Sequence, residues 1–294
     1  MTKIIAVANQ KGGVGKTTTS VNLAACLAAA ERRVLLVDLD PQGNASSGLG
    51  LDRASFAEKN IYHVLIDELP IREAVYSTEL EYLKVCPADN NLSGAEVELV
   101  QAIARETRLK NAFEDLQQLA TPSFDYVVID CPPSLGLLTL NALTAAHHYL
   151  IPLQCEYYAM EGLSQILKTA ELVRKGLNRE LKQLGILLTM YDSRNNLSKQ
   201  VLEEVQNHFK GSVFETVVPR NVKLSESPSH GKPVILYDIS SSGSQSYLQL
   251  AQEVMQRLEQ KEAITEVTAE NAAALPVPGP TRGVEQGGVE HGVS

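Results

Sequence analysis

A loop rich in glycine and lysine directly follows the first apolar run, and this feature most constrains how the chain can fold. Residues 3–8 read Lys-Ile-Ile-Ala-Val-Ala, and residues 9–19 read Asn-Gln-Lys-Gly-Gly-Val-Gly-Lys-Thr-Thr-Thr. A strand, a glycine-rich loop and a helix in this order form a cradle in which backbone N–H groups and the helix N-terminus bind phosphate. The segment therefore predicts a nucleotide site in an α/β fold.

Each residue type in this loop has a chemical reason to be there. Glycines let the backbone bend so that successive N–H groups point at phosphate oxygens. Lys16 is expected to reach the β- and γ-phosphates, and the Thr17 hydroxyl is expected to bind Mg²⁺. The residues expected to contact the nucleotide in this loop are Lys11, Gly12, Gly13, Val14, Gly15, Lys16, Thr17 and Thr18.

Three carboxylates stand at the ends of two further apolar runs. Asp38 and Asp40 follow Leu-Leu-Val, and the period of two in a strand places them on the same side of the chain. Asp130 ends the run Tyr-Val-Val-Ile-Asp. Carboxylates gathered at one sheet edge repel unless a cation or a proton-transfer role separates them. The alternative for Asp38 and Asp40 is a structural one, as helix-capping residues in a polar turn.

Strand-like and helical stretches alternate along the chain. Continuous apolar strands separated by helices are typical of a doubly wound α/β fold, with a mostly parallel sheet and helices on both faces, as in P-loop NTPases. We expect one such domain over residues 1–260. The expected strands are residues 3–8, 33–38, 82–86, 126–130, 148–153, 184–189 and 213–218, and the expected helices are 17–30, 104–120, 162–177, 197–209 and 244–260.

Residues 261–294 differ in composition from the rest of the chain. They are rich in proline and glycine, with two basic and five acidic residues, so we expect a disordered acidic tail. The formal net charge of −9 lowers the expectation of a nucleic-acid partner without excluding it, because a local basic patch decides such binding. With no secretion signal and four scattered cysteines, the protein is expected to be cytoplasmic, with its thiols buried.

The loop departs from the standard pattern G-x-x-x-x-G-K-[S/T]. Its first position is Gln10, and it has an additional lysine, Lys11. This arrangement resembles the deviant Walker-A ATPases, which include ParA/Soj partition proteins, MinD and nitrogenase iron protein. Residues 40–44, 129–136, 152–159, 219–226 and 228–233 are similar to those of the small chromosomal ParA/Soj type, in the family's order, so that the resemblance extends to about residue 258.

The resemblance implies a Mg²⁺-dependent ATPase that partitions chromosomes or plasmids and has slow basal turnover. In this family an ATP-bound homodimer binds DNA without sequence preference. A ParB/Spo0J-type protein at centromere-like sites, together with DNA, stimulates hydrolysis, and the protein returns to a monomer. The implied location is the nucleoid, without stable membrane association.

The resemblance also assigns roles to catalytic and metal-binding residues. It implies that Lys11 crosses the dimer interface to the partner's phosphates, as an arginine finger supplied in trans does. Asp40 would orient the attacking water. The resulting candidates are Lys11, Lys16 and Asp40 for catalysis, and Thr17, Asp38 and Asp130 for Mg²⁺.

The later part of the chain supplies candidates for adenine and DNA contacts. By resemblance, Pro219 and Asn221 border the adenine. Residues 194–232 contain six basic and four acidic residues, which gives a modest basic excess. Residues 239–244 read Ile-Ser-Ser-Ser-Gly-Ser where relatives often carry basic residues, which predicts a weaker electrostatic footprint. The DNA-binding candidates are Arg194 and Arg220, with Lys199 and Lys223 as helpers.

Three alternatives remain open from the sequence. A MinD-like membrane ATPase would need a basic face on the last helix, where Arg257 is the only basic residue over 244–260. A nitrogenase-type reductase would need two cysteine ligands per subunit, and the position of Cys131 does not supply them. A binding module without turnover is disfavoured because Lys16, Asp40 and Asp130 are all present.

Overall fold

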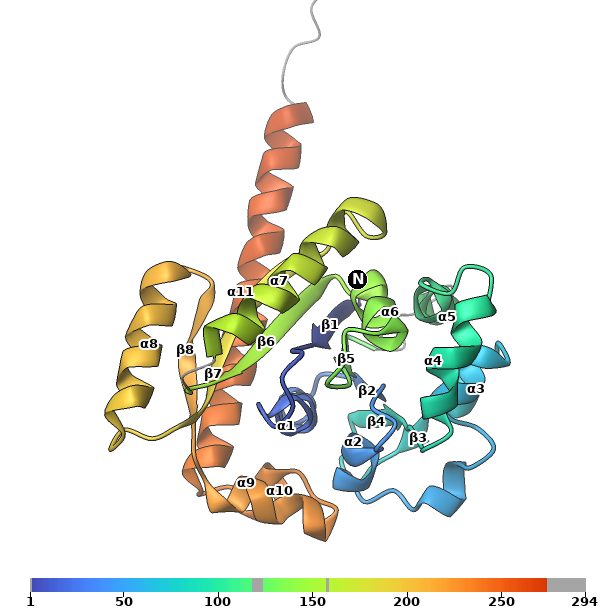
Figure 1. Ribbon diagram of the computed structural model, residues 1–294, viewed down its shortest axis with the longest axis horizontal. Helices are drawn as coiled ribbons and strands as arrows, with labels where there is room; N and C mark the ends of the chain where they lie inside the picture. Colours follow the sequence, from blue (N-terminus) through green and yellow to red (C-terminus); the bar gives the residue numbers. More distant parts are fainter. Residues whose placement is uncertain (1, 118–123, 157–158, 274–294) are drawn as a thin grey trace, which may run out of the picture. The chain divides into compact units, whose positions relative to one another are not determined.

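The computed structural model describes residues 2–117, 124–156 and 159–273. Its central element is an eight-stranded sheet with the order β3-β4-β2-β5-β1-β6-β7-β8 (Figure 1). Every neighbouring pair is parallel except β3 with β4. The strands are β1 (Lys3–Val7), β2 (Val34–Asp38), β3 (Tyr76–Ser77), β4 (Leu83–Cys86), β5 (Tyr126–Asp130), β6 (His148–Gln154), β7 (Lys182–Tyr191) and β8 (Val213–Pro219).

Helices connect most of the strands, so the prediction of a mostly parallel, doubly wound sheet is confirmed. The α-helices are α1 (Lys16–Ala29), α2 (Asn44–Gly48), α3 (Ile61–Ile66), α4 (Leu92–Gln101), α5 (Arg108–Gln117), α6 (Leu137–Ala145), α7 (Ala159–Gly176), α8 (Asn196–His208), α9 (Val222–Glu226), α10 (Val234–Tyr237) and α11 (Ser242–Ala273). Three short 3₁₀ helices span Arg53–Phe56, Ile71–Ala74 and Ser227–His230.

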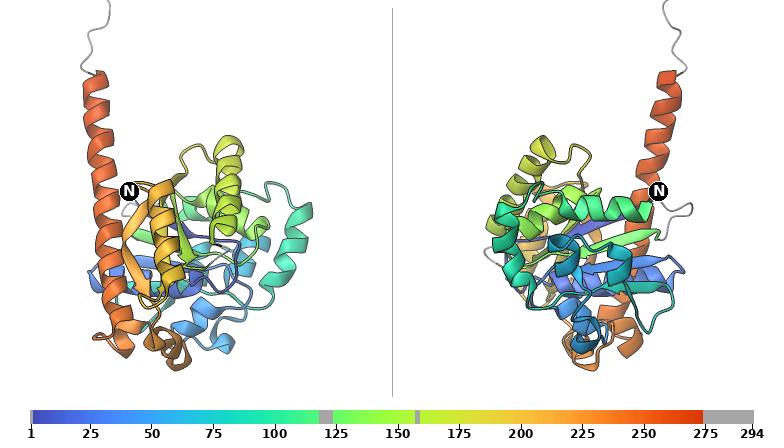
Figure 2. Two further views of the ribbon diagram at one scale, coloured as in Figure 1. Left: turned by 60° about the vertical axis from the view of Figure 1, so that its left-hand side comes forward. Right: turned by 90° about the vertical axis from the view of Figure 1, so that its right-hand side faces the viewer.

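Both faces of the sheet are covered, because its strands alternate buried apolar residues toward each side. One face, including Ile4 and Val37, joins apolar residues of α3 to α8 in a continuous core. The alternate residues, such as Ile5 and Leu36, are also fully buried, on the face that packs against α1. The first turns of α11 lie beside α1 (Figure 2), where the Thr19 and Tyr247 hydroxyls are 3.1 Å apart.

The strand register determines where the functional loops meet. Val7 of β1 pairs with Asp130 of β5, and Asp130 pairs with Asp38 of β2. The carboxyl ends of these three strands therefore lie at the same height, side by side. Farther along the same edge, Tyr191 of β7 pairs with Pro219 at the end of β8. This edge positions every candidate residue discussed below.

Some boundaries differ from those expected. The helix expected over 104–120 begins later, as α5, and residues 118–123 lie outside the described residues. Neither α4 nor α6 was predicted. In α6, seven of the nine residues are buried, so it shows no polar face to reveal a helical period. The two-residue strand β3 was also missed.

The C-terminal helix is longer than expected. α11 continues past residue 260 to Ala273, and residues 274–294 lie outside the described part of the chain. Two compact units divide the chain, residues 1–255 and residues 256–294. In the first unit Tyr247, Leu250 and Val254 are buried, as their helical stripe predicts. Disorder of the tail beyond α11 stays a prediction.

Two further expectations concern cysteines and membranes. All four cysteines are buried free thiols, as expected from their scattered positions. Across residues 2–117, 124–156 and 159–273, no helix is both long and apolar enough to cross a membrane.

Candidate functional site

The loop between β1 and α1 has the geometry of a phosphate cradle. Gly13 and Gly15 have φ angles of 75° and 87°, a left-handed backbone that residues with a Cβ rarely adopt. Gly15 is the N-cap of α1 and has no side chain to cap the helix. The first backbone N–H groups of α1 are therefore not capped by a residue at this position and suit an anion. Val14 is buried between them, and its carbonyl accepts a 2.8 Å hydrogen bond from the Thr189 hydroxyl of β7.

Lys16 begins α1 inside this cradle and is only 6% exposed. Its Nζ donates a 3.0 Å hydrogen bond to the carbonyl of Lys11. Burial lowers the pKa of Lys16, and nearby Asp130 and Asp40 partly oppose that shift. A buried ammonium with one neutral acceptor and nearby carboxylates is suited to a further anion, such as a phosphate group.

Lys11 points away from its own loop. Its Nζ forms a 2.7 Å ion pair with Glu156, just beyond the end of β6. Its backbone N–H donates to Asn9 Oδ1, and Asn9 Nδ2 donates to the carbonyl of Pro152. The lysine loop is thereby tied to the end of β6. Glu156 was not among the sequence candidates, because nothing local in the sequence indicates a partner 145 residues away.

Asp38 and Asp130 are fully buried neighbours on adjacent strands. Asp38 accepts hydrogen bonds from the Ser46 backbone N–H and hydroxyl on one oxygen, and from the Asp40 backbone N–H on the other. Ser20 of α1 donates to Asp130 Oδ1 at 2.9 Å. The other oxygen of Asp130, Oδ2, is buried without a hydrogen-bond partner among the described residues.

The electrostatics of this pair favour a bound cation. Burial raises the pKa of Asp130, the negative charge of Asp38 raises it further, and the Thr17 hydroxyl lies close enough to oppose the rise. Burial also raises the pKa of Asp38, against the hydrogen bonds from Ser46. A divalent cation near Asp130 and Thr17 would offset the burial and the repulsion together.

Asp40 differs from the buried pair. It lies beyond the end of β2, is 8% exposed, and accepts a 3.0 Å hydrogen bond from the Gln42 backbone N–H. Its carboxylate is therefore fixed in a tight turn on the edge that carries the phosphate loop. Asp38, with both oxygens engaged, holds the backbone of this turn through the Asp40 N–H. This arrangement partly matches the alternative in which Asp38 is a structural, helix-capping residue in a polar turn.

Similarity to known proteins covers this site and most of the chain. Residues 2–183 match the family model described as AAA domain. The chain is 60% identical over 255 residues to "Chromosome partitioning protein ParA" of Myxococcus xanthus, covering 87% of this chain and 88% of that protein. It is 59% identical over 254 residues to "Sporulation initiation inhibitor protein Soj" of Bacillus subtilis, covering 86% and 98%. The chain belongs to the ParA/Soj family.

Two solved structures extend the comparison. A Mycobacterium smegmatis protein named cobyrinic acid a,c-diamide synthase, with bound ADP and magnesium, is 40% identical, with a TM-score of 0.76 over 88% of this chain and 96% of its own. The MinD cell-division ATPase of Pyrococcus furiosus is 27% identical, with a TM-score of 0.70 over 87% and 99%. The P-loop fold is therefore shared more widely than the ParA/Soj names.

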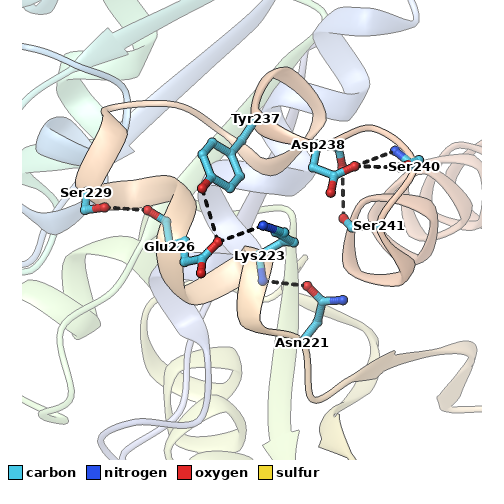
Figure 3. Close-up of polar contacts among 8 residues, drawn as sticks. All are labelled: Asn221, Lys223, Glu226, Ser229, Tyr237, Asp238, Ser240 and Ser241. Atoms are coloured by element: carbon cyan, nitrogen blue, oxygen red, sulfur yellow. Dashed lines mark hydrogen bonds and ion pairs between the residues drawn. The ribbon is translucent and has the colours of Figure 1, made fainter.

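In this ParA/Soj chain, the adenine candidates lie at the end of β8. Pro219 is the last residue of that strand, and Asn221 is the N-cap of α9. The Asn221 side chain accepts a 2.8 Å hydrogen bond from the Lys223 N–H and donates one to the Ser242 hydroxyl. Figure 3 shows Asn221 turned toward the start of α9. Its contacts fix the loop, and an adenine contact stays a prediction.

The DNA candidates fall in two places on these loops. Arg194 and Arg220 each stand one residue before an Asn N-cap, at the starts of α8 and α9. The Arg220 N–H donates to the carbonyl of Tyr191, so the two loops lie side by side. Both arginines are exposed, as is Lys199 on α8.

Lys223 is less available for a DNA phosphate than the sequence indicates. Its Nζ forms a 3.0 Å ion pair with Glu226 and lies 5.4 Å from the centre of the Tyr237 ring. Glu226 also accepts a hydrogen bond from the Tyr237 hydroxyl (Figure 3). This lysine is thus held within the α9–α10 segment. Asp192 and Glu226, which pair with basic candidates, were missed because the resemblance names only the basic residues of these loops.

Proposed function

We propose that this chain is an ATP-dependent partitioning ATPase that acts on chromosomal or plasmid DNA. One observation carries the proposal. A two-lysine phosphate loop stands beside Asp40 and Asp130 in a chain whose relatives with 59% and 60% identity are named Soj and ParA. A MinD-like membrane role has less support, since the MinD structure is a more distant relative and the start of α11 is packed against α1.

ATP with Mg²⁺ is the proposed ligand of the loop. Lys16 binds the β- and γ-phosphates, and the backbone N–H groups of residues 12–18 surround them. The chemistry of Thr17 and Asp130 fits Mg²⁺, because a hydroxyl and an oxygen without a hydrogen-bond partner lie close together. Mg²⁺ would neutralise charge on the phosphate oxygens. Mg²⁺ commonly keeps several waters and binds through one or two carboxylates together with substrate phosphates.

Hydrolysis in this proposal depends on a second subunit. Asp40 orients the attacking water from its fixed turn. Lys11 releases Glu156 and reaches the phosphates of the partner subunit in an ATP-bound homodimer. Two features support this assignment. The ammonium of Lys11 points away from its own loop, and its ion pair with Glu156 is only partly buried, so it can exchange for a phosphate contact.

The dimer is proposed to bind DNA without sequence preference through Arg194 and Arg220, with Lys199 and Lys223 as helpers. Phosphate contacts give affinity without reading the sequence. DNA binding by the dimer would locate the protein on the nucleoid. A ParB/Spo0J-type protein, together with DNA, would stimulate hydrolysis and return the chain to a monomer.

DNA co-sedimentation with ATP, with ADP and without nucleotide tests the proposal. Binding is expected only with ATP, equally on unrelated duplexes, and it should weaken steeply with salt. Lys16→Ala is the control, because it should remove the ATP dependence while keeping the candidate DNA face. Equal binding in all three nucleotide states, or none in any, would contradict the proposal.

A further inference from the structure

A carboxylate pairs with one of the two arginines of the candidate DNA face and lies near the other. Asp192 follows β7 directly, and Arg194 lies two residues later. Arg194 Nε donates to Asp192 Oδ1 at 3.0 Å, and Nη2 donates to Oδ2 at 2.8 Å. This is the two-pronged geometry in which a guanidinium also takes a phosphate group. The Arg194 side chain is nevertheless 87% exposed and open to solvent.

The second arginine follows the next strand, β8, and lies near the same carboxylate without forming an ion pair that the structure records. The Arg220 N–H is bonded to the carbonyl of Tyr191, the residue just before Asp192. The pKa of Asp192 is lowered to about 2, mainly by the hydrogen bonds from Arg194 and to a smaller extent by the charge of Arg220. Asp192 therefore keeps its negative charge at neutral pH, inside a group of two positive charges.

We propose that Asp192 occupies the phosphate position of Arg194, near Arg220, and competes there with the backbone phosphates of nucleic acid. The inference rests on the DNA binding proposed above. A phosphate must displace the carboxylate to take the two-pronged contact with Nε and Nη2 of Arg194, and it must approach against the charge of Asp192. Asp192 thus weakens the DNA binding of the ATP-bound dimer.

The expected size follows from the exposure of the pair. Exchanging one exposed ion pair for another changes affinity by roughly 1.5- to 5-fold per subunit. Since a dimer would carry two such positions, the combined change is about 2- to 25-fold. For an ATPase that must leave DNA after each cycle, such weakening keeps DNA binding reversible.

Asp192→Asn is the test variant. Besides its ion pair, Asp192 Oδ1 accepts the Arg194 backbone N–H at 3.0 Å. Asparagine keeps an oxygen acceptor for that turn and removes the charge. Asp52→Asn is the matched control, because exposed Asp52 accepts the Ala54 N–H in the same way and caps a different turn. Asp192→Ser, which also keeps a hydroxyl acceptor, replaces the first variant if it does not fold.

Affinity for a fluorescent duplex is measured by anisotropy with a non-hydrolysable ATP analogue, across a salt titration. Asp192→Asn should bind about 2- to 25-fold more tightly than the parent, with a steeper salt dependence and unchanged ATP affinity. Asp52→Asn should match the parent. In the Asp192→Asn background, Arg194→Ala should cost more affinity than it does in the parent, because the guanidinium is then free for phosphate.

Each outcome decides the inference. If the parent binds DNA only with ATP and Asp192→Asn binds no better, Asp192 is not a competitor, while the proposed function stands. If Asp52→Asn gains as much DNA affinity as Asp192→Asn, the gain comes from the change in net charge alone, and the inference is overturned. The same holds if Arg194→Ala costs the same in both backgrounds. If no variant binds DNA in any nucleotide state, the proposed function fails and the inference fails with it.

Discussion

The two candidate regions of this chain are built from charged residues in opposite ways. At the nucleotide site, Lys16 is only 6% exposed, and Asp38 and Asp130 are fully buried in the register of adjacent strands. On the candidate DNA face, 87% of the Arg194 side chain is exposed, and its partner is another surface charge. The carboxylates of the first region are held by paired strands of the sheet, and the arginines of the second lie in the loops that follow its strands.

This difference predicts how each region responds to change. A buried charged group loses its hydration on folding, so removing its partner is costly and little screened by salt. An exposed ion pair contributes little and is weakened by salt. Variants at the nucleotide site should therefore change function by orders of magnitude, and variants on the DNA face by a few-fold in a salt-dependent way.

Lys16→Ala is expected to have the broadest effect, because every later step depends on bound ATP. It removes the buried ammonium from the phosphate cradle, so ATP affinity should fall by roughly 10- to 100-fold, and dimerisation, DNA binding and turnover should fall with it. Isothermal titration calorimetry with ATP and size-exclusion chromatography would measure both effects. Normal ATP affinity in this variant would show that the loop is not the phosphate site.

Lys11→Ala should separate binding from turnover. ATP affinity of the monomer should stay near that of the parent, while DNA- and partner-stimulated turnover should fall by up to about 10³- to 10⁵-fold, the range for a cationic finger supplied in trans. Parent turnover per subunit should rise with protein concentration, because Lys11 acts only after two subunits meet. Turnover that is independent of concentration and unchanged in Lys11→Ala would remove the trans role.

Asp40→Ala should give a smaller loss confined to hydrolysis. The phosphate loop remains, so the variant should bind ATP, dimerise and stay on DNA, while turnover falls by roughly 10²- to 10⁴-fold through loss of a water-orienting group. Size-exclusion chromatography with ATP measures dimerisation, and a phosphate-release assay measures turnover. A monomeric variant, or one with parent turnover, would move the role elsewhere, first to Asp38.

The same contrast explains what the sequence could predict. The loop and its three carboxylates were predictable because each lies within or beside a local motif, and parallel pairing then brings the motifs to one edge. Thr17 and Asp130 meet in this way across more than a hundred residues. The mostly parallel fold followed from the alternation of strands and helices, while the buried helix α6 gave no period to detect.

Partners that depend on tertiary packing could not be predicted. Glu156 meets Lys11 because the ends of β1 and β6 are adjacent, and Ser46 meets Asp38 because α2 folds back over β2. Asp192 was overlooked for another reason. The exposed arginines were assigned by resemblance, which names the cations and says nothing of the carboxylate paired with them.

The smallest effects should fall on the DNA face, and they should be unequal. We expect Arg220→Ala to weaken DNA binding more than Arg194→Ala, while both keep ATP-driven dimerisation. The guanidinium of Arg194 is already paired with the Asp192 carboxylate, whereas Arg220 forms no ion pair closer than 4 Å with the residues that the structure describes.

Anisotropy across a salt titration measures this difference, with Arg32→Ala as the matched control. Arg32 is an exposed arginine just before β2, at the opposite edge of the sheet. In a dimer, Arg220→Ala removes two phosphate contacts, so the slope of log affinity against log salt should shrink by up to about 1.8 units. The loss should be equal on unrelated duplexes, because phosphates carry no sequence information.

The neighbours of Arg220 require one more measurement. Since it lies between Pro219 and Asn221, its removal could also disturb the nucleotide, and the ATP affinity of each variant must be determined alongside. Arg194→Ala is free of that ambiguity and should shrink the slope by less. If both variants bind DNA like the parent at every salt concentration, the proposed face is wrong. If Arg194→Ala is the more damaging of the two, the ion pair with Asp192 does not restrain Arg194, and the contrast between the two regions is weaker than their exposure implies.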